Sequence, residues 1–178
     1  MTTAATLSHY AEYYALRGAV AALDRVSLRR AGAIGEWIGA LGYRPLGIRR
    51  AVVERQVRAA FPGLDEAEVL RIARASYEHL GRTSIETAVL PTYSRERVLG
   101  LFERVEGWDV VERALARGRG ILFVSGHLGN WELGGSLIAA RGVPLEAVTR
   151  RMQNPLFDRY ITETRRKIGM TVIHDADA

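Results

Sequence analysis

The chain has 178 residues, of which 48% are hydrophobic, and 25 basic against 20 acidic residues give it a net charge of +5. The length suits one domain, or one domain and part of another, and the apolar content is ordinary for a globular chain. No cysteine is present, which excludes disulfides, thiolate metal sites and a thiol nucleophile within this sequence. Lys167 is the only lysine, so the remaining basic residues are arginines, whose forked guanidinium groups suit phosphates. An arginine-rich chain equally reflects genomic base composition.

The N-terminal part is predicted to be helical. Residues 8–43 carry apolar positions at helical spacing, with breaks expected at glycines, and residues 48–60 form a further helix. Asp65, with Glu68 three residues later, predicts the N-cap of a long helix that ends by Pro91. Amphipathic helices of this kind either pack on a core or lie in a membrane interface.

The C-terminal part alternates between strand and helix patterns. Ser94 is expected to cap a short helix. The remaining predicted elements are an edge strand at 105–107, a helix at 108–117, a buried strand at 121–124, a helix at 130–140, a strand at 144–149, a helix at 155–168 and a strand at 170–174. This order predicts the α/β class, with a mostly parallel βαβ sheet. We expect one domain over 1–178, with a helical region at 1–104 and an α/β core at 105–178.

The segment GHLGNWE at 126–132 follows directly on the apolar run at 121–124. His127 is a candidate general base, because imidazole accepts protons near neutral pH. Glu132 is a candidate for holding the imidazole tautomer and stabilising the imidazolium. Gly129 lets backbone N–H groups approach a substrate closely. A capping or core histidine, and a first-turn glutamate that complements the helix dipole, are the alternatives.

The same segment resembles the HX4E motif of the bacterial lipid A biosynthesis acyltransferases of the lauroyl and myristoyl type. That family is a branch of the lysophospholipid acyltransferase superfamily. Further likenesses cover most of the chain: Arg150 with NPLFD at 154–158, the R-x-x-x-G of Arg165 and Gly169, AFP at 60–62, and the helix around Glu86. The resemblance implies the glycerolipid acyltransferase type of fold. Because family members usually begin with an apolar anchor helix and continue well beyond this endpoint, it also implies a truncated, N-terminal part of such an enzyme.

The resemblance implies a reaction as well. A fatty acyl group passes from an acyl carrier protein or acyl-CoA thioester to a hydroxyl of a lipid A precursor or a related glycolipid, with His127 and Glu132 as the catalytic pair. Substrate-binding roles then fall on Gly129, Asn130, Arg150, Asn154 and Arg165. From the residues alone, Asn130 and Asn154 predict helix caps, the latter with Pro155 at the first helical position.

We expect no cofactor beyond the thioester and, without an H-E-x-x-H pattern, no catalytic metal. The sequence contains no run of 18 uncharged apolar residues, so it predicts no membrane-spanning helix. The resemblance implies a peripheral location at the cytoplasmic face of the bacterial inner membrane, with the basic pairs Arg29-Arg30 and Arg49-Arg50 near anionic lipid.

Two other functions compete with acyl transfer. One is a membrane-associated relative or truncated fragment without catalysis. The other is a basic nucleic-acid-binding module, which the charge alone supports, because no recognition motif accompanies it.

Overall fold

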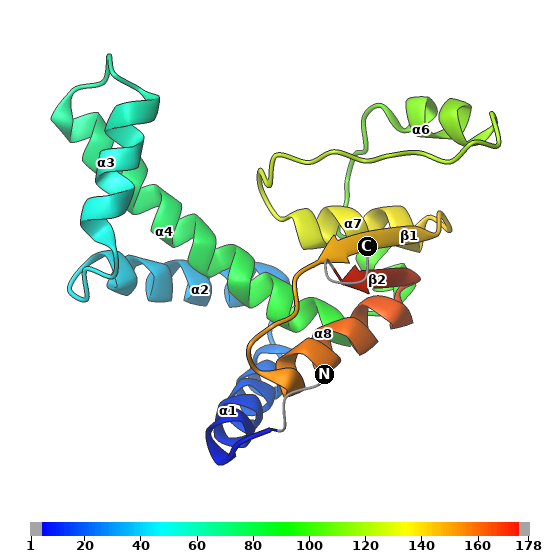
Figure 1. Cartoon of the computed structure of the whole chain (residues 1–178), viewed down its shortest axis with the longest axis horizontal. Helices are drawn as coiled ribbons and strands as arrows, with labels where there is room; N and C mark the ends of the chain where they lie inside the picture. The colour runs from blue at the N-terminus through cyan, green and yellow to red at the C-terminus, as the bar shows by residue number, and fades with distance from the viewer. Residues whose placement is uncertain (1–4, 175–178) are drawn as a thin grey trace. The chain divides into compact units, whose positions relative to one another are not determined.

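The computed structural model describes residues 5–174. It divides into two compact units, Met1–Thr92 and Tyr93–Ala178, which are considered separately below. Figure 1 shows the helices of the first unit in blue to green, and the strands with their neighbouring helices in yellow to red. The mixed α/β class predicted from the sequence is confirmed.

Unit 1 consists of helices. Their bounds are α1 Leu7–Leu23, α2 Leu28–Tyr43, α3 Arg50–Ala60, α4 Glu66–Val89 and the 3-10 turn η1 Leu90–Thr92. The predicted cap at Asp65 is confirmed, since its Oδ1 accepts the N–H of Glu68 at 2.8 Å. Among the described residues, no helix is long and apolar enough to cross a membrane.

The helical prediction for residues 8–43 was wrong about where the chain breaks. The interruption falls between Leu23 and Leu28, where Ser27 caps α2, whereas Gly35 and Gly39 stay inside that helix. These glycines serve packing. A Cβ atom on Gly39 would overlap the carbonyl oxygen of Tyr77, and one on Gly35 would overlap that of Gly81. The antiparallel helices α2 and α4 therefore touch backbone to backbone.

Polar contacts surround this crossing. Arg82 on α4 donates to Glu36 on α2 at 2.7 Å, and this hydrogen bond lowers the pKa of Glu36. On α3, the carboxylate of Glu54 accepts hydrogen bonds from Tyr43 at 2.9 Å and from Arg50 at 2.6 Å. The Tyr43 ring is buried at the end of α2, so α3 is fastened to α2 through Glu54.

Unit 2 contains a small parallel sheet and four helices within the described residues. The bounds are α5 Arg95–Leu99, α6 Trp108–Leu115, α7 Trp131–Ala140, β1 Leu145–Thr149, α8 Pro155–Lys167 and β2 Met170–His174. Strands β1 and β2 pair in parallel from Leu145 opposite Met170 to Thr149 opposite His174. Because α8 connects them, β1, α8 and β2 form the βαβ unit that the alternating pattern predicts.

Two predicted strands are wrong. Residues 105–107 and 121–124 lie outside any strand, and Leu122 and Val124 are each 89% exposed. A strand pattern describes residues that fit a pleated, half-buried surface, and it forms a strand only where a neighbouring strand supplies the hydrogen bonds. The larger parallel sheet of the glycerolipid acyltransferase type stays a prediction.

Helix α7 lies against the sheet. A Cβ atom on Gly135 would stand 3.1 Å from Cε of Met170 on β2, so the glycine allows close approach. Leu137, Ala139 and Ala140 on the same helix are buried. The 126–132 segment ends in the first turn of α7. The packing of the rest of α7 against the sheet therefore fixes the position of this turn.

The glycine contact between α2 and α4 leads to a stability prediction. Gly39→Ala should lower the free energy of unfolding by about 1–3 kcal/mol, because the added methyl group forces the two backbones apart. Gly18 lies inside α1, and a Cβ atom there would have no neighbouring atom within 4 Å, so Gly18→Ala should raise stability by about 0.5–1 kcal/mol through helix propensity. Urea unfolding measures both, and equal effects of the two substitutions would contradict the packing explanation.

Candidate active site

His127 lies in the loop between α6 and α7 and adopts a left-handed backbone conformation, with φ at 53°. Few non-glycine residues adopt this conformation, and such outliers gather at functional sites. The imidazole is exposed and stacks on the Trp131 ring, with centroids 4.7 Å apart and an angle of 16° between the planes. Its backbone N–H donates to Oγ of Ser125 at 3.2 Å. The candidate base is therefore accessible and oriented by an aromatic neighbour.

The turn into α7 is built by the next residues of the same segment. Gly129 has φ at 65°, a conformation that glycine adopts without strain. Asn130 is the N-cap, as the sequence predicts, and its Oδ1 accepts the N–H of Leu133 at 3.0 Å. Glu132 lies in the first turn of α7, where a carboxylate is favoured by the helix dipole.

The Glu132 carboxylate is held by Arg165. The Nε of Arg165 donates to Oε2 at 3.1 Å, and its Nη2 donates to Oε1, so the contact is bidentate. The two side chains are only 13% and 14% exposed, which weakens competition from water. Arg165 comes from the last turn of α8, 33 residues away in sequence. The structure thus brings together two predicted site residues in a pairing that the sequence analysis did not foresee.

This pairing bears on the predicted roles without deciding them. The sequence analysis assigned Glu132 to the imidazole of His127, and Arg165 to the substrate. In this structure Glu132 pairs with Arg165, and His127 stacks on Trp131. Both assignments stay predictions.

Arg150 and Asn154 lie on the connection from β1 to α8. Asn154 is the N-cap of α8, as predicted: its Oδ1 accepts the N–H of Leu156 at 3.0 Å, and Pro155 is at the first helical position. Its side chain is buried, whereas Arg150, directly after β1, is exposed. The connection therefore presents a cation to solvent at the carboxyl end of a parallel strand, the edge where α/β sheets bind ligands.

One pair escaped the sequence analysis. Nε2 of His174, the last residue of β2, lies 3.9 Å from Oδ2 of Asp158 on α8, and the His174 side chain is 13% exposed. No local signal could have found it, because it depends on the parallel pairing that places the end of β2 beside α8. The described residues contain no group of three His, Cys, Asp or Glu side chains positioned to hold a metal ion.

An exposed histidine lies just before the N-cap of α7, and the first turn of that helix carries Glu132, half-buried against Arg165 of α8. An imidazole in such a place is able to accept and return a proton. Comparison with known protein families identifies the class of this protein. The family model described as Bacterial lipid A biosynthesis acyltransferase matches residues 4–178. The chain belongs to this family, which confirms the resemblance seen in its motifs.

Curated relatives agree. The chain is 27% identical to the lipid A biosynthesis palmitoleoyltransferase of Escherichia coli K12 over 140 residues, which cover 79% of this chain and 45% of that protein. It is 26% identical to the lipid A biosynthesis lauroyltransferase of the same organism over 144 residues, covering 81% and 46%. It is 32% identical to the phosphatidylinositol mannoside acyltransferase of Mycobacterium tuberculosis H37Rv over 101 residues, covering 56% and 32%. At most, then, the chain spans about half the length of these relatives. No solved structure gave a significant match.

The contact between Glu132 and Arg165 is testable as a double-mutant cycle with Glu132→Gln, Arg165→Gln and the combination. We expect a coupling of about 1–3 kcal/mol in the free energy of unfolding, because a charge-assisted bidentate contact away from water is strong. Denaturant unfolding of the four proteins gives this value.

The matched control is the pair of Arg58 with Glu66, which is also bidentate but exposed, with side-chain exposures of 45% and 62%. Its coupling should stay below about 1 kcal/mol. Equal couplings for the two pairs would contradict the importance of burial.

Proposed function

We propose that this protein transfers a fatty acyl group from a thioester, on an acyl carrier protein or coenzyme A, to a hydroxyl of a lipid A precursor or related glycolipid. The observation that carries the proposal is the left-handed, exposed His127, which lies just before a helix whose first turn carries the half-buried contact between Glu132 and Arg165. A non-glycine residue held in an uncommon backbone conformation, shortly before a half-buried charge pair in the sequence, is a candidate site for chemistry.

In the proposed reaction, an imidazole nitrogen of His127 takes the proton of the acceptor hydroxyl. The hydroxyl oxygen then attacks the thioester carbonyl, a C–O bond forms, and the C–S bond breaks. The leaving thiolate takes the proton back from the imidazolium, so the histidine is regenerated. No covalent acyl-enzyme is needed, because the acceptor oxygen attacks directly.

Glu132 stabilises the imidazolium in this proposal. The imidazole now stacks on Trp131, the first residue of α7, and it has to exchange this stacking for a hydrogen bond to Glu132; its exposed loop gives it room to do so. Arg165 then acts as a positioning residue, since its fork holds the carboxylate at a fixed place on α7. A bidentate arginine fixes the carboxylate plane better than a single donor does.

Substrate contacts are proposed for the residues around this pair. Gly129 leaves space for a close approach to backbone N–H groups, which would meet the negative oxygen of the tetrahedral intermediate. Arg150 is proposed to bind a phosphate of either substrate. The proposed contribution of Asn130 and Asn154 is through their caps, which fix the loops that carry His127 and Arg150.

The choice of acceptor rests on the relatives. The printed names of two of them specify lipid A biosynthesis, and that of another specifies phosphatidylinositol mannoside. These names have a glycolipid in common. The family match favours the lipid A precursor, and the proposed setting is peripheral, at the cytoplasmic face of the inner membrane.

Replacing the base tests the proposal. His127→Ala should lower the rate of acyl transfer about 10²–10⁴-fold, the usual loss when a general base is removed. The assay follows a labelled acyl chain from acyl carrier protein or acyl-CoA to the glycolipid acceptor. The matched control is His79→Ala, which removes an exposed histidine from α4 and should leave the rate unchanged. Turnover of the His127 variant at the wild-type rate would contradict the mechanism. An inactive wild-type protein would favour the non-catalytic relative.

A second test concerns the membrane surface. Arg29, Arg30 and Arg49 are exposed, whereas Arg50 pairs with Glu54 and stacks on Tyr43, so only the first three are free of a packing role. Replacing these three with Gln should weaken binding to anionic liposomes, since each basic residue near such a surface contributes about 1 kcal/mol.

The matched control removes three exposed arginines of unit 2, namely Arg117, Arg119 and Arg166, for the same change in net charge. Liposome flotation at low and high salt measures both variants. Equal weakening by the two triple substitutions would show that net charge alone, rather than the N-terminal surface, governs binding.

A further inference from the structure

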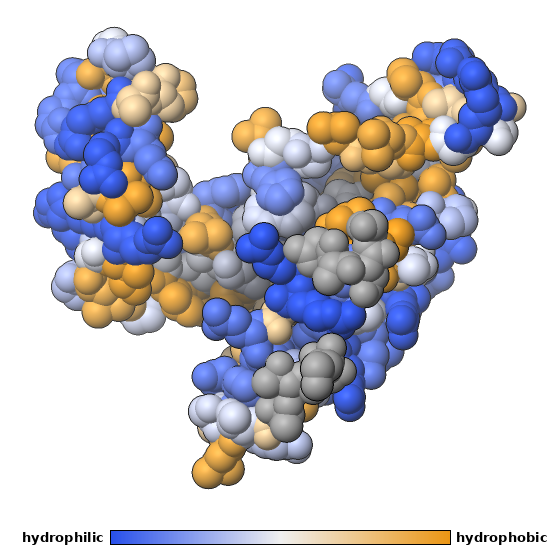
Figure 2. All heavy atoms as spheres, in the orientation of Figure 1, coloured by the Kyte–Doolittle hydropathy of each residue, from blue (hydrophilic) through white to orange (hydrophobic). Residues whose placement is uncertain are grey.

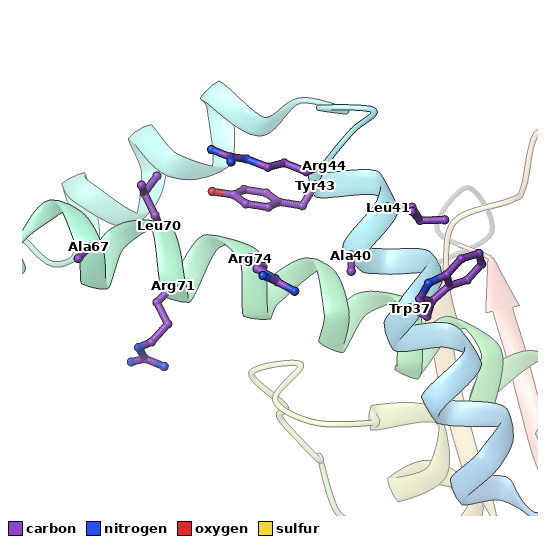
Figure 3. Close-up of a pocket in the computed structure, with 9 residues that line it drawn as sticks. All are labelled: Trp37, Ala40, Leu41, Tyr43, Arg44, Ala67, Leu70, Arg71 and Arg74. Atoms are coloured by element: carbon purple, nitrogen blue, oxygen red, sulfur yellow. The ribbon is translucent and has the colours of Figure 1, made fainter.

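A groove of about 620 Å³ lies between α2 and α4. It is lined by residues of unit 1, whereas every candidate residue for acyl transfer belongs to unit 2. Figure 3 shows the side chains that line it. Its apolar lining comes from Trp37, Ala40 and Leu41 on α2 and from Ala67 and Leu70 on α4. The volume is within the range of roughly 300–1,000 Å³ that is usual for small-molecule sites.

The groove follows from the way these helices pack. Backbone contact at Gly39 brings α2 and α4 together, and the lining of the groove includes the small side chains of Ala40 and Ala67. Alanine side chains cannot fill the space that opens as two crossing helices diverge. The apolar groove beside the crossing therefore stays unfilled, with space for a slender apolar group.

Three arginines line this groove: Arg44 at the C-terminal end of α2, and Arg71 and Arg74 on α4. Within the described part of the chain, no carboxylate pairs with the exposed Arg44. Arg71 pairs with Glu68 and Arg74 with Glu78, but the two guanidinium side chains are 65% and 63% exposed. Exposed pairs of this kind are weak, so an incoming anion competes with the carboxylates at little disadvantage.

The groove also opens onto apolar surface. Trp37 is 64% exposed although it lines the groove, and Ile34 and Ile38 on the same helix are 42% and 47% exposed. Figure 2 shows hydrophobic patches bordered by hydrophilic atoms over the part of the surface formed by α2 and α3. The apolar lining and the apolar surface around the groove suit a hydrocarbon chain, and the arginines beside it suit a negatively charged headgroup. The groove therefore matches an anionic amphiphile.

We propose that this groove binds one molecule of an anionic phospholipid, as a site separate from acyl transfer. One acyl chain lies along the lining of Ala40, Leu41, Ala67 and Leu70. The phosphodiester meets Arg44, and Arg74 exchanges its contact with Glu78 for a second phosphate oxygen. A guanidinium binds a phosphate through two hydrogen bonds, which fixes the headgroup end of the lipid.

The experiment titrates the purified chain with short-chain phosphatidylglycerol held below its micelle concentration, and calorimetry gives the dissociation constant. Arg44→Gln should weaken binding on the order of tenfold, the equivalent of one charge-assisted hydrogen bond. Ala67→Phe fills the groove from an exposed helix position and should abolish binding. Short-chain phosphatidylcholine, which has no net charge, should bind at least about tenfold more weakly.

Matched variants separate this site from general effects. Arg55→Gln removes an exposed arginine from α3, and Ala75→Phe adds a ring at another exposed position of α4. Neither residue lines the groove, and both variants should bind within about twofold of the wild type. Lipid should change the tryptophan fluorescence of the wild type but not that of Trp37→Phe.

Several outcomes would overturn the proposal. They are equal affinity for the two lipids, equal loss in Arg44→Gln and Arg55→Gln, and unchanged binding in Ala67→Phe. Displacement of the lipid by inorganic phosphate alone would assign the site to free anions. Sedimentation showing that Ala67→Phe dissociates a dimer, with lipid binding unchanged, would assign the groove to a second copy of the chain.

Discussion

The contact between Glu132 and Arg165 joins the first turn of α7 to the last turn of α8, and the position of the Glu132 carboxylate depends on it. Each charge also lies at the helix end that favours its sign: a carboxylate at an N-terminus and a guanidinium at a C-terminus. The dipoles and the ion pair therefore act in the same sense and offset the desolvation of both groups. Removing either partner leaves the other charged and mostly out of water, which is the more costly state. Through this contact the βαβ unit and the helix that begins beside His127 become one framework.

In unit 1 a different interaction holds the two principal helices together. Glycines at the contact have no side chain, so the backbones of α2 and α4 pack directly against each other. Gly35 and Gly39 on α2 face Gly81 and the Tyr77 carbonyl on α4, so main-chain atoms make contacts that side chains make elsewhere. Glycine inside a helix has an entropic disadvantage of about 1 kcal/mol relative to alanine, which dispersion contacts between the backbones have to exceed. The groove lies beyond this region of close contact, where the small side chains of Ala40 and Ala67 leave space between the two helices.

What the sequence predicts well is local. The caps at Asp65, Asn130 and Asn154 depend on a side chain and a backbone N–H two or three residues away, and all three form. The run at 121–124 fails as a strand because strand formation needs a partner that no local pattern specifies. The pairing of Glu132 with Arg165 could not be predicted from the sequence for the same reason. It spans 33 residues and depends on how α7 and α8 pack. The motif identified both residues as site candidates, but only the packing could show that they bind each other.

His127 differs from that pair in what holds it. A left-handed histidine is strained by about 1 kcal/mol or more, and such a conformation persists only where its surroundings determine it. Here the determinants are adjacent: Gly129 turns the chain, the Asn130 cap fixes the start of α7, and the Trp131 ring lies parallel to the imidazole. None of these contacts involves Glu132 or Arg165. The candidate base and the carboxylate proposed to stabilise its protonated form therefore have independent anchors, one in the turn before α7 and the other in the contact between two helices. For this reason, loss of the ion pair should affect the electrostatics around the imidazole while leaving the loop that carries it in place.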